Sequence, residues 1–147
     1  MINKELTLNV SLEIEAPISK VWDAVINPEK IKKYFFGTEA ISDWKEGSEL
    51  KFQGEWEGTP YVDKGTILEI ESEKILKYDY ISSFSQLEDK PENRAIIAMK
   101  VSPTSTGTML EIIQQGFESK ETYEHSESNW KSVMEDMKKR VESNDWM

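Results

Sequence analysis

The feature that most constrains the fold is the spacing of apolar residues, because this spacing changes along the chain. Over residues 6–14 every second residue is apolar, which is typical of a half-buried β-strand. Over residues 122–144 the apolar positions instead follow the i, i+3, i+4, i+7 spacing of an amphipathic helix. The chain therefore contains both strands and helices, and it must bury the apolar stripe of its last helix against a sheet.

Two short helices are expected between the first strand and the rest of the sheet. Pro17 suits the first turn of a helix, where no backbone N–H bond is lost, and apolar residues follow it at helical spacing. A second start signal comes at residues 27–29, where an Asn that can cap a helix is followed by Pro and Glu. We expect this second helix to carry Tyr34 and Phe35 and to end at Gly37.

The stretch from Gly37 to Phe117 reads as short strands and turns. Turn residues gather at 58–60 and 102–107, a polar loop is expected at 86–93, and no helical pattern lies between them. This indicates an antiparallel meander rather than parallel βαβ units. The alternating residues of its successive strands are Leu50, Phe52 and Trp56; Thr66, Leu68 and Ile70; Leu76, Tyr78 and Tyr80; Ala95, Ile97, Met99 and Val101; and Leu110 and Ile112. The sequence predicts one α+β domain spanning residues 1–147.

Composition excludes several functions. The chain has 18 Lys and Arg residues and 28 Asp and Glu residues, so its formal charge is −10. This charge disfavours nucleic acids and anionic membrane surfaces as partners. Cysteine is absent and His125 is the single histidine, so neither thiolate nor multi-histidine metal sites are expected. No signal peptide or membrane span is expected, which predicts a cytoplasmic protein. No metal or cofactor is expected either.

The chain carries a series of short motifs: Ala16-Pro17 with Val21-Trp22, Asn27-Pro28-Glu29-Lys30-Ile31 with Tyr34-Phe35, Trp44 before Glu46-Gly47, Gly65-Thr66-Ile67-Leu68-Glu69-Ile70, Gly107-Thr108-Met109-Leu110, Gln115-Gly116-Phe117 and Asn129-Trp130. Together these motifs resemble the START-like, or SRPBCC, helix-grip superfamily. Within it, the chain is most similar to the family of the C-terminal domain of heat-shock-protein-ninety ATPase activators. The chain departs from the family at Glu46-Gly47, where a Gly-Gly pair is usual, and at Asn129-Trp130, where Gly-Trp is usual.

This resemblance implies a curved antiparallel sheet of about six or seven strands. Two short helices accompany the sheet, and a long C-terminal helix packs on its concave face, often with an apolar cavity between helix and sheet. Some members of the superfamily bind lipids or aromatic molecules, some are cyclases or hydrolases, and the members that give the family its name act on a chaperone. The family has no universal catalytic residue, so the resemblance assigns none here.

The residues themselves offer little catalytic chemistry. The acids and serines that could assist His125 in catalysis are only its neighbours along the sequence. His125 is therefore expected on the surface, away from any catalytic partner. Glu69, Glu71 and Glu73 share one strand face, which is expected to be solvated. A cyclase-like or hydrolase-like enzyme would require a buried Asp or Glu that faces the cavity. No catalytic residue is therefore predicted.

Aromatic, Met and amide side chains at expected inward positions are the informative feature. They either fill the core or line a cavity with adaptable apolar walls and a few polar anchors. The predicted lining is Tyr34, Phe35, Phe52, Trp56, Tyr78, Tyr80, Met99, Met109, Gln115, Trp130, Met134 and Met137.

The leading functional hypothesis is a binding module for a small apolar or aromatic ligand. A co-chaperone-like interaction protein is the alternative that the family resemblance implies, and its partner would be a chaperone. A cyclase-like or hydrolase-like enzyme is the third hypothesis. Both a monomer and a homodimer are consistent with the sequence.

Overall fold

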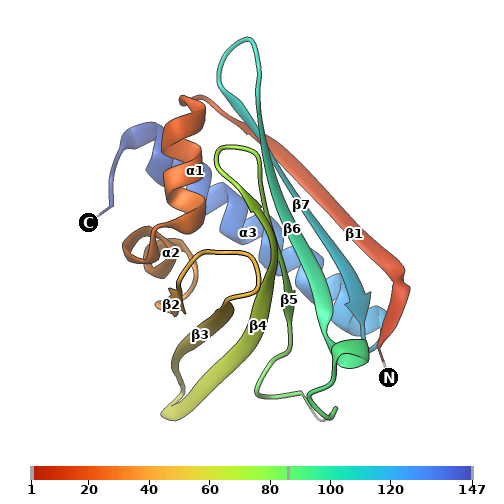
Figure 1. Ribbon diagram of the computed structural model, residues 1–147. Helices are drawn as coiled ribbons and strands as arrows, with labels where there is room; N and C mark the ends of the chain where they lie inside the picture. The colour runs from red at the N-terminus through yellow and green to blue at the C-terminus, as the bar shows by residue number, and fades with distance from the viewer. Residues whose placement is uncertain (1, 86, 147) are drawn as a thin grey trace.

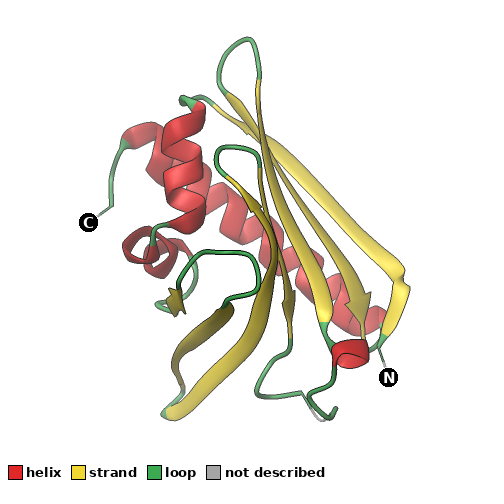
Figure 2. Ribbon diagram, viewed as in Figure 1, coloured by secondary structure: helices red, strands yellow, loops and turns green. Residues whose placement is uncertain are grey.

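The protein forms a seven-stranded antiparallel sheet and three α-helices (Figures 1 and 2). The structure, a computed structural model, describes residues 2–85 and 87–146, with the backbone alone for Trp56. The strands are β1 (Asn3–Ile14), β2 (Glu39–Ser42), β3 (Glu49–Trp56), β4 (Thr59–Glu71), β5 (Ile75–Tyr80), β6 (Ala95–Pro103) and β7 (Thr108–Phe117). The helices are α1 (Ile18–Ile26), α2 (Pro28–Tyr34) and α3 (Lys120–Ser143), with a short 3₁₀ turn, η1 (Pro91–Asn93).

The strand order across the sheet is β1-β7-β6-β5-β4-β3-β2, and every pairing is antiparallel. The long helix α3 runs diagonally across one face of the sheet, while α1 and α2 lie beside it at one end (Figure 1). This is the helix-grip α+β architecture that the sequence predicts, and the prediction is confirmed.

Local sequence signals explain where α3 begins and ends. The Ser119 hydroxyl accepts a bond from the Thr122 N–H, and the Thr122 side chain accepts one from the Ser119 N–H, which forms a capping box. Asn144 ends the helix in the left-handed conformation, with φ at 54°. Within the described residues, no helix combines the length and the apolar character needed to cross a bilayer.

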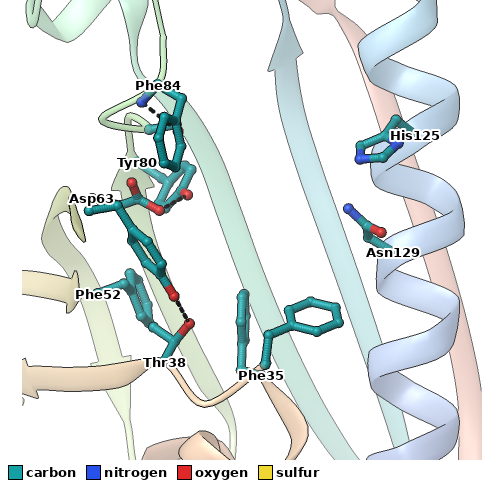
Figure 3. A pocket seen from close by; sticks show the side chains of 11 residues that line it. Phe35, Thr38, Phe52, Asp63, Tyr80, Phe84, His125 and Asn129 are labelled. Atoms are coloured by element: carbon teal, nitrogen blue, oxygen red, sulfur yellow. Dashed lines mark hydrogen bonds between the residues drawn. The ribbon is translucent and has the colours of Figure 1, made fainter. Parts of the chain in front are cut away.

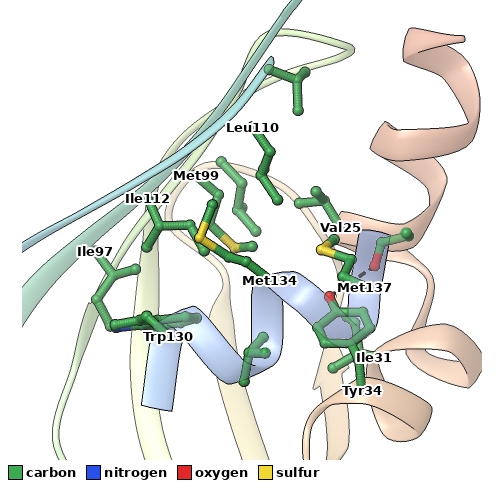
Figure 4. Packing of buried hydrophobic residues seen from close by; sticks show 14 of the residues in the cluster. Val25, Ile31, Tyr34, Ile97, Met99, Leu110, Ile112, Trp130, Met134 and Met137 are labelled. Carbon is green, nitrogen blue, oxygen red and sulfur yellow. Dashed lines mark hydrogen bonds between the residues drawn. The ribbon is translucent and has the colours of Figure 1, made fainter. Parts of the chain in front are cut away.

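The core fills the space between the sheet and the second half of α3 (Figure 4). Met134 and Met137 are fully buried, and Figure 4 shows them between the sheet residues Leu110 and Ile112 and the helical residues of α1 and α2. Met side chains suit this position because their flexible thioether chains fill irregular gaps. This part of the helix is therefore held by close packing.

The alternation in β4 differs from the sequence prediction. Of the predicted alternating residues Thr66, Leu68 and Ile70, Ile70 does pack against the core. Leu68, however, is 42% exposed, and Ile67 is buried instead, at 1% exposure. The pairing of β4 with β5 shifts register between Ile67 and Glu69, and such an irregularity changes which side chains face inward. Because Ile67 and Leu68 are adjacent and both apolar, the sequence alone does not determine which of the two faces inward.

Candidate ligand-binding groove

A groove of about 560 Å³ opens between the sheet and the first half of α3 (Figure 3). Its size lies within the range of small-molecule sites. It is lined by residues from α3, β3, β4, β5 and the loops after α2 and β5: Phe35, Phe36, Thr38, Phe52, Tyr61, Asp63, Tyr80, Ser82, Phe84, His125 and Asn129. The groove is thus built from segments that are far apart in the sequence.

Aromatic rings form most of its apolar wall. Phe35 stacks on Phe52 with ring centroids 5.9 Å apart, and Phe52 lies 6.1 Å from Tyr80. Near the mouth, Tyr61 lies 6.0 Å from Phe84. These separations are typical of interacting aromatic pairs, so the rings support one another and present a continuous apolar surface.

A buried carboxylate lies in this wall. Asp63 is 8% exposed, and its Oδ2 accepts a hydrogen bond of 2.5 Å from the Tyr80 hydroxyl. Its Oδ1 accepts a 2.8 Å bond from the Ser83 backbone N–H. Burial is the main cause that raises the pKa of Tyr80 far above its usual value, and the nearby Asp63 carboxylate raises it further. The phenol therefore remains a hydrogen-bond donor. Asp63 is therefore held in place by two donors at the edge of the groove.

A second polar pair closes the side of the groove next to α2. The hydroxyls of Thr38 and Tyr61 are 2.5 Å apart and share a hydrogen bond. Tyr61 pairs directly with Gly54 across β3 and β4, and its ring lies where a side chain at Gly54 would be. A Cβ built on Gly54 would come within 2.6 Å of the Tyr61 hydroxyl oxygen. The glycine thus lets Tyr61 lie flat along the groove wall.

The opposite wall belongs to α3. His125 and Asn129 are one helical turn apart, and Figure 3 shows both pointing from the helix toward the gap. Both side chains are exposed. A smaller hollow of about 170 Å³ continues inward from here, lined in part by Tyr78, Gln114 and Trp130. At its floor, the Trp130 Nε1–H donates a 2.9 Å hydrogen bond to the Gln114 Oε1.

Five of the predicted lining residues meet at this groove or at its inner hollow. Phe35, Phe52 and Tyr80 line the groove, and Tyr78 and Trp130 line the hollow. Four others, Tyr34, Met99, Met134 and Met137, are buried in the closed core. The space beside Tyr34 and Met99 is only about 20 Å³, roughly that needed for one water. These four contribute packing, which was the competing interpretation of the pattern.

Met109 and Gln115 lie on the other face of the sheet, which corrects the predicted lining. Side chains alternate along β7, and the inward positions are those of Leu110, Ile112 and Gln114. The amide that faces α3 is therefore Gln114 and not its neighbour. The side chain of the remaining predicted residue, Trp56, lies outside the described part of the chain.

Sequence reasoning missed most of the polar groove residues. His125 is exposed, as the sequence predicts, but its place on the groove wall was not predicted. Tyr61 and Asp63 lie two residues apart on one face of β4. This alternation is visible in the sequence, but the predicted alternation begins only at Thr66. The other missed residues are Phe36, Thr38, Ser82, Phe84 and Asn129.

Among the residues that the structure describes, no three His, Asp or Glu side chains come together as a metal site would require. In this part of the chain, Asp63 and His125 are the groove's ionisable side chains apart from the tyrosines. The chemistry of the site is therefore that of aromatic surfaces, hydroxyls, an amide, one imidazole and one buried carboxylate.

A curved antiparallel sheet that holds a long helix over an aromatic groove defines a START-like helix-grip protein. The family model described as "Activator of Hsp90 ATPase homolog 1-like protein" matches residues 15–142. The chain belongs to this family. The match covers the segment from the end of β1 to the last turn of α3, so it includes the groove.

Solved structures agree with this assignment. The solution structure of ChR145 from Cytophaga hutchinsonii is 42% identical, with 95% of each chain covered and a TM-score of 0.82. MLL2253 from Mesorhizobium loti is 22% identical over 95% of this chain and 99% of that one, with a TM-score of 0.79. The Aha1 dimer from Colwellia psychrerythraea is 14% identical, with coverage of 93% and 96% and a TM-score of 0.74. The last two show the shared fold alone. A comparison with curated proteins finds no match.

Proposed function

We propose that this protein binds a small apolar or aromatic molecule in the groove between the sheet and the first half of α3. The observation that carries the proposal is an aromatic-lined space of about 560 Å³, which contrasts with the space of only about 20 Å³ in the core beside Tyr34 and Met99. Phe35 and Phe52 offer ring faces, while Tyr61, Asp63 and Asn129 offer the few polar contacts that fix a ligand's orientation. We place this binding module in the cytoplasm.

The test is saturable binding of a neutral fluorescent probe, N-phenyl-1-naphthylamine. We expect one probe per protein chain, with fluorescence enhancement in the apolar groove. Asn129→Trp places an indole in the groove and should abolish binding. Ser128→Trp adds the same side chain at the neighbouring exposed position of α3, outside the groove lining, and should leave binding intact.

Equal binding by both tryptophan variants would contradict the proposal, because the probe would then bind elsewhere. Native mass spectrometry of freshly purified protein complements this test by showing whether a small molecule is carried along. Asp63 is the buried inward carboxylate that a cyclase-like enzyme would require. A recovered molecule that is chemically changed after incubation would therefore convert the binding proposal into an enzymatic one.

A second candidate function is a co-chaperone role, which the family match favours. Two exposed phenylalanines, Phe36 and Phe84, lie at the groove mouth and would be available to a protein partner. Stimulation of the ATPase rate of a purified heat-shock-protein-ninety chaperone would support this role. An unchanged rate, with no complex on size-exclusion chromatography, would remove it. The same chromatography tests whether the chain is a monomer or a homodimer.

A further inference from the structure

The groove contains a carboxylate, Asp63, that forms no ion pair with any residue that the structure describes. The ion pairs that involve the described residues leave out Asp63, although its side chain is almost fully buried. Its two hydrogen-bond donors, the Tyr80 hydroxyl and the Ser83 N–H, are neutral groups. A buried carboxylate without a counter-charge is costly, so the site favours anything that brings a positive charge to it.

Aromatic rings surround this carboxylate. Tyr80 contacts it directly, Tyr61 lies two residues away on the same face of β4, and Phe84 follows the residue whose backbone N–H binds Asp63. Figure 3 places Asp63 between Phe84 on one side and Phe52 on the other. Ring faces carry partial negative charge and attract organic cations at distances up to about 6 Å.

The surroundings of Asp63 also favour cations over anions. No Lys or Arg is found among the described residues that line the groove or the adjoining hollow of about 540 Å³ at its mouth. That hollow adds another carboxylate, Glu118. The net charge of −10 also raises the local concentration of cations around the protein. An anionic ligand would be repelled by the groove carboxylate, by Glu118 and by the net charge of the protein.

We propose that the ligand of this groove is an organic cation, with a flat apolar body against Phe35 and Phe52 and an ammonium group paired with Asp63. This inference rests on the proposed binding function and specifies the class of ligand. A bare metal ion does not fit, because divalent cations require several oxygen ligands and Asp63 is the only carboxylate in the groove lining within the described chain.

The experiment compares three probes that share one ring system and differ in charge. These are 1-naphthylmethylammonium, 1-naphthylmethanol and 1-naphthoate, titrated into the full chain at neutral pH and low salt by isothermal titration calorimetry. We expect the ammonium compound to bind about tenfold more tightly than the alcohol, and the carboxylate to bind most weakly. This ranking is measured on the unmodified protein and needs no variant.

Asp63→Asn then tests the carboxylate itself. Asn keeps the size of the side chain and one oxygen acceptor, so we expect the ammonium compound to bind no better than the alcohol, whose affinity stays within about twofold. Asp43→Asn, the same change at an exposed loop position, should leave the tenfold preference unchanged.

The outcomes separate the two proposals. Binding of the alcohol as tight as that of the ammonium compound would overturn the cation inference and leave the binding function standing. Binding of none of the three would overturn both. A tenfold preference that survives Asp63→Asn would also overturn the inference, since the preference would then arise elsewhere.

Discussion

The two halves of the space under α3 differ although one sheet and one helix build both. In the packed half, around Met134 and Met137, apolar side chains from the helix and the sheet fill the interior. In the open half, beside His125 and Asn129, the helix presents short polar side chains and the interior stays accessible as the groove. The comparison indicates that the packed half provides stability, which allows the open half to remain unfilled.

The boundary between the halves is a buried polar contact. Trp130 covers the end of the packed half, and its indole N–H is bonded to Gln114. Phe35 meets Trp130 edge-on, with ring centroids 5.9 Å apart, so the same tryptophan also supports the groove wall. Substitutions on the two sides of this boundary should therefore separate effects on stability from effects on binding.

The largest expected effect is on stability in the packed half. Met137→Ala should lower the free energy of unfolding by about 2–5 kcal/mol, because it leaves a cavity at a fully buried site. Met137→Leu, which roughly conserves volume, should cost less than about 1.5 kcal/mol. Urea unfolding measures both. Probe affinity should not change in either folded variant, and a parallel loss of affinity would show that the halves are not separable.

Gln114→Met should have the next largest effect, at the boundary. It removes the acceptor of the buried Trp130 N–H and should cost about 1–3 kcal/mol in urea unfolding. Adding Trp130→Phe removes the unpaired donor as well. The double variant should therefore lose less than the sum of the two single losses. Strict additivity would mean that the hydrogen bond contributes nothing measurable.

Phe84→Ala should affect binding in the open half and leave stability almost unchanged. Phe84 is 57% exposed, so the free energy of unfolding should stay within about 0.5 kcal/mol. Loss of its ring from the groove wall should weaken N-phenyl-1-naphthylamine binding about three- to tenfold. Leu68→Ala, at another exposed apolar position outside the groove lining, is the control and should not alter probe affinity. Equal effects of the two changes would place the probe outside the groove.

The smallest effect concerns acid stability on the outer side of the sheet. Arg94 bonds to Asp89, and this bond lowers the pKa of the Asp89 carboxyl. A lowered pKa in the folded state gives stability above about pH 4 that is lost as the pH falls through the folded-state value.

Because this pair is partly exposed, its contribution should be below about 1 kcal/mol. Asp89→Asn should therefore reduce the dependence of unfolding free energy on pH below about pH 4, as measured by urea unfolding. An unchanged slope would show that the ion pair does not contribute. Probe binding at neutral pH should be the same in this variant, because the pair lies outside the groove.

The sequence predicts the packed half better than the open half, for a physical reason. Helical periodicity identifies Met134 and Met137 as inward residues because a buried stripe must repeat at fixed spacing. That pattern cannot say whether an inward residue meets a neighbour or faces a gap, so the same two residues were also predicted as cavity lining. The distinction depends on how far the sheet curves away from the helix.

The open half depends on contacts that no local pattern encodes. Asp63 meets Tyr80 across the sheet and Ser83 in the loop beyond it, and His125 faces them from α3. Bringing these segments together requires the register of the whole meander, and one misassigned residue reverses the face of a strand. Gln114 and Gln115 illustrate this, because one step along β7 moves an amide from the core to the outer surface.

The most direct test of the central claim is to map probe binding onto the chain by backbone amide NMR. We expect N-phenyl-1-naphthylamine to shift the amides of Tyr61, Asp63, Phe84, His125 and Asn129, with amides around Met137 unmoved. That pattern would place the ligand in the open half. Shifts confined to α1 or to the outer face of the sheet, or no shifts at saturating probe, would contradict the account.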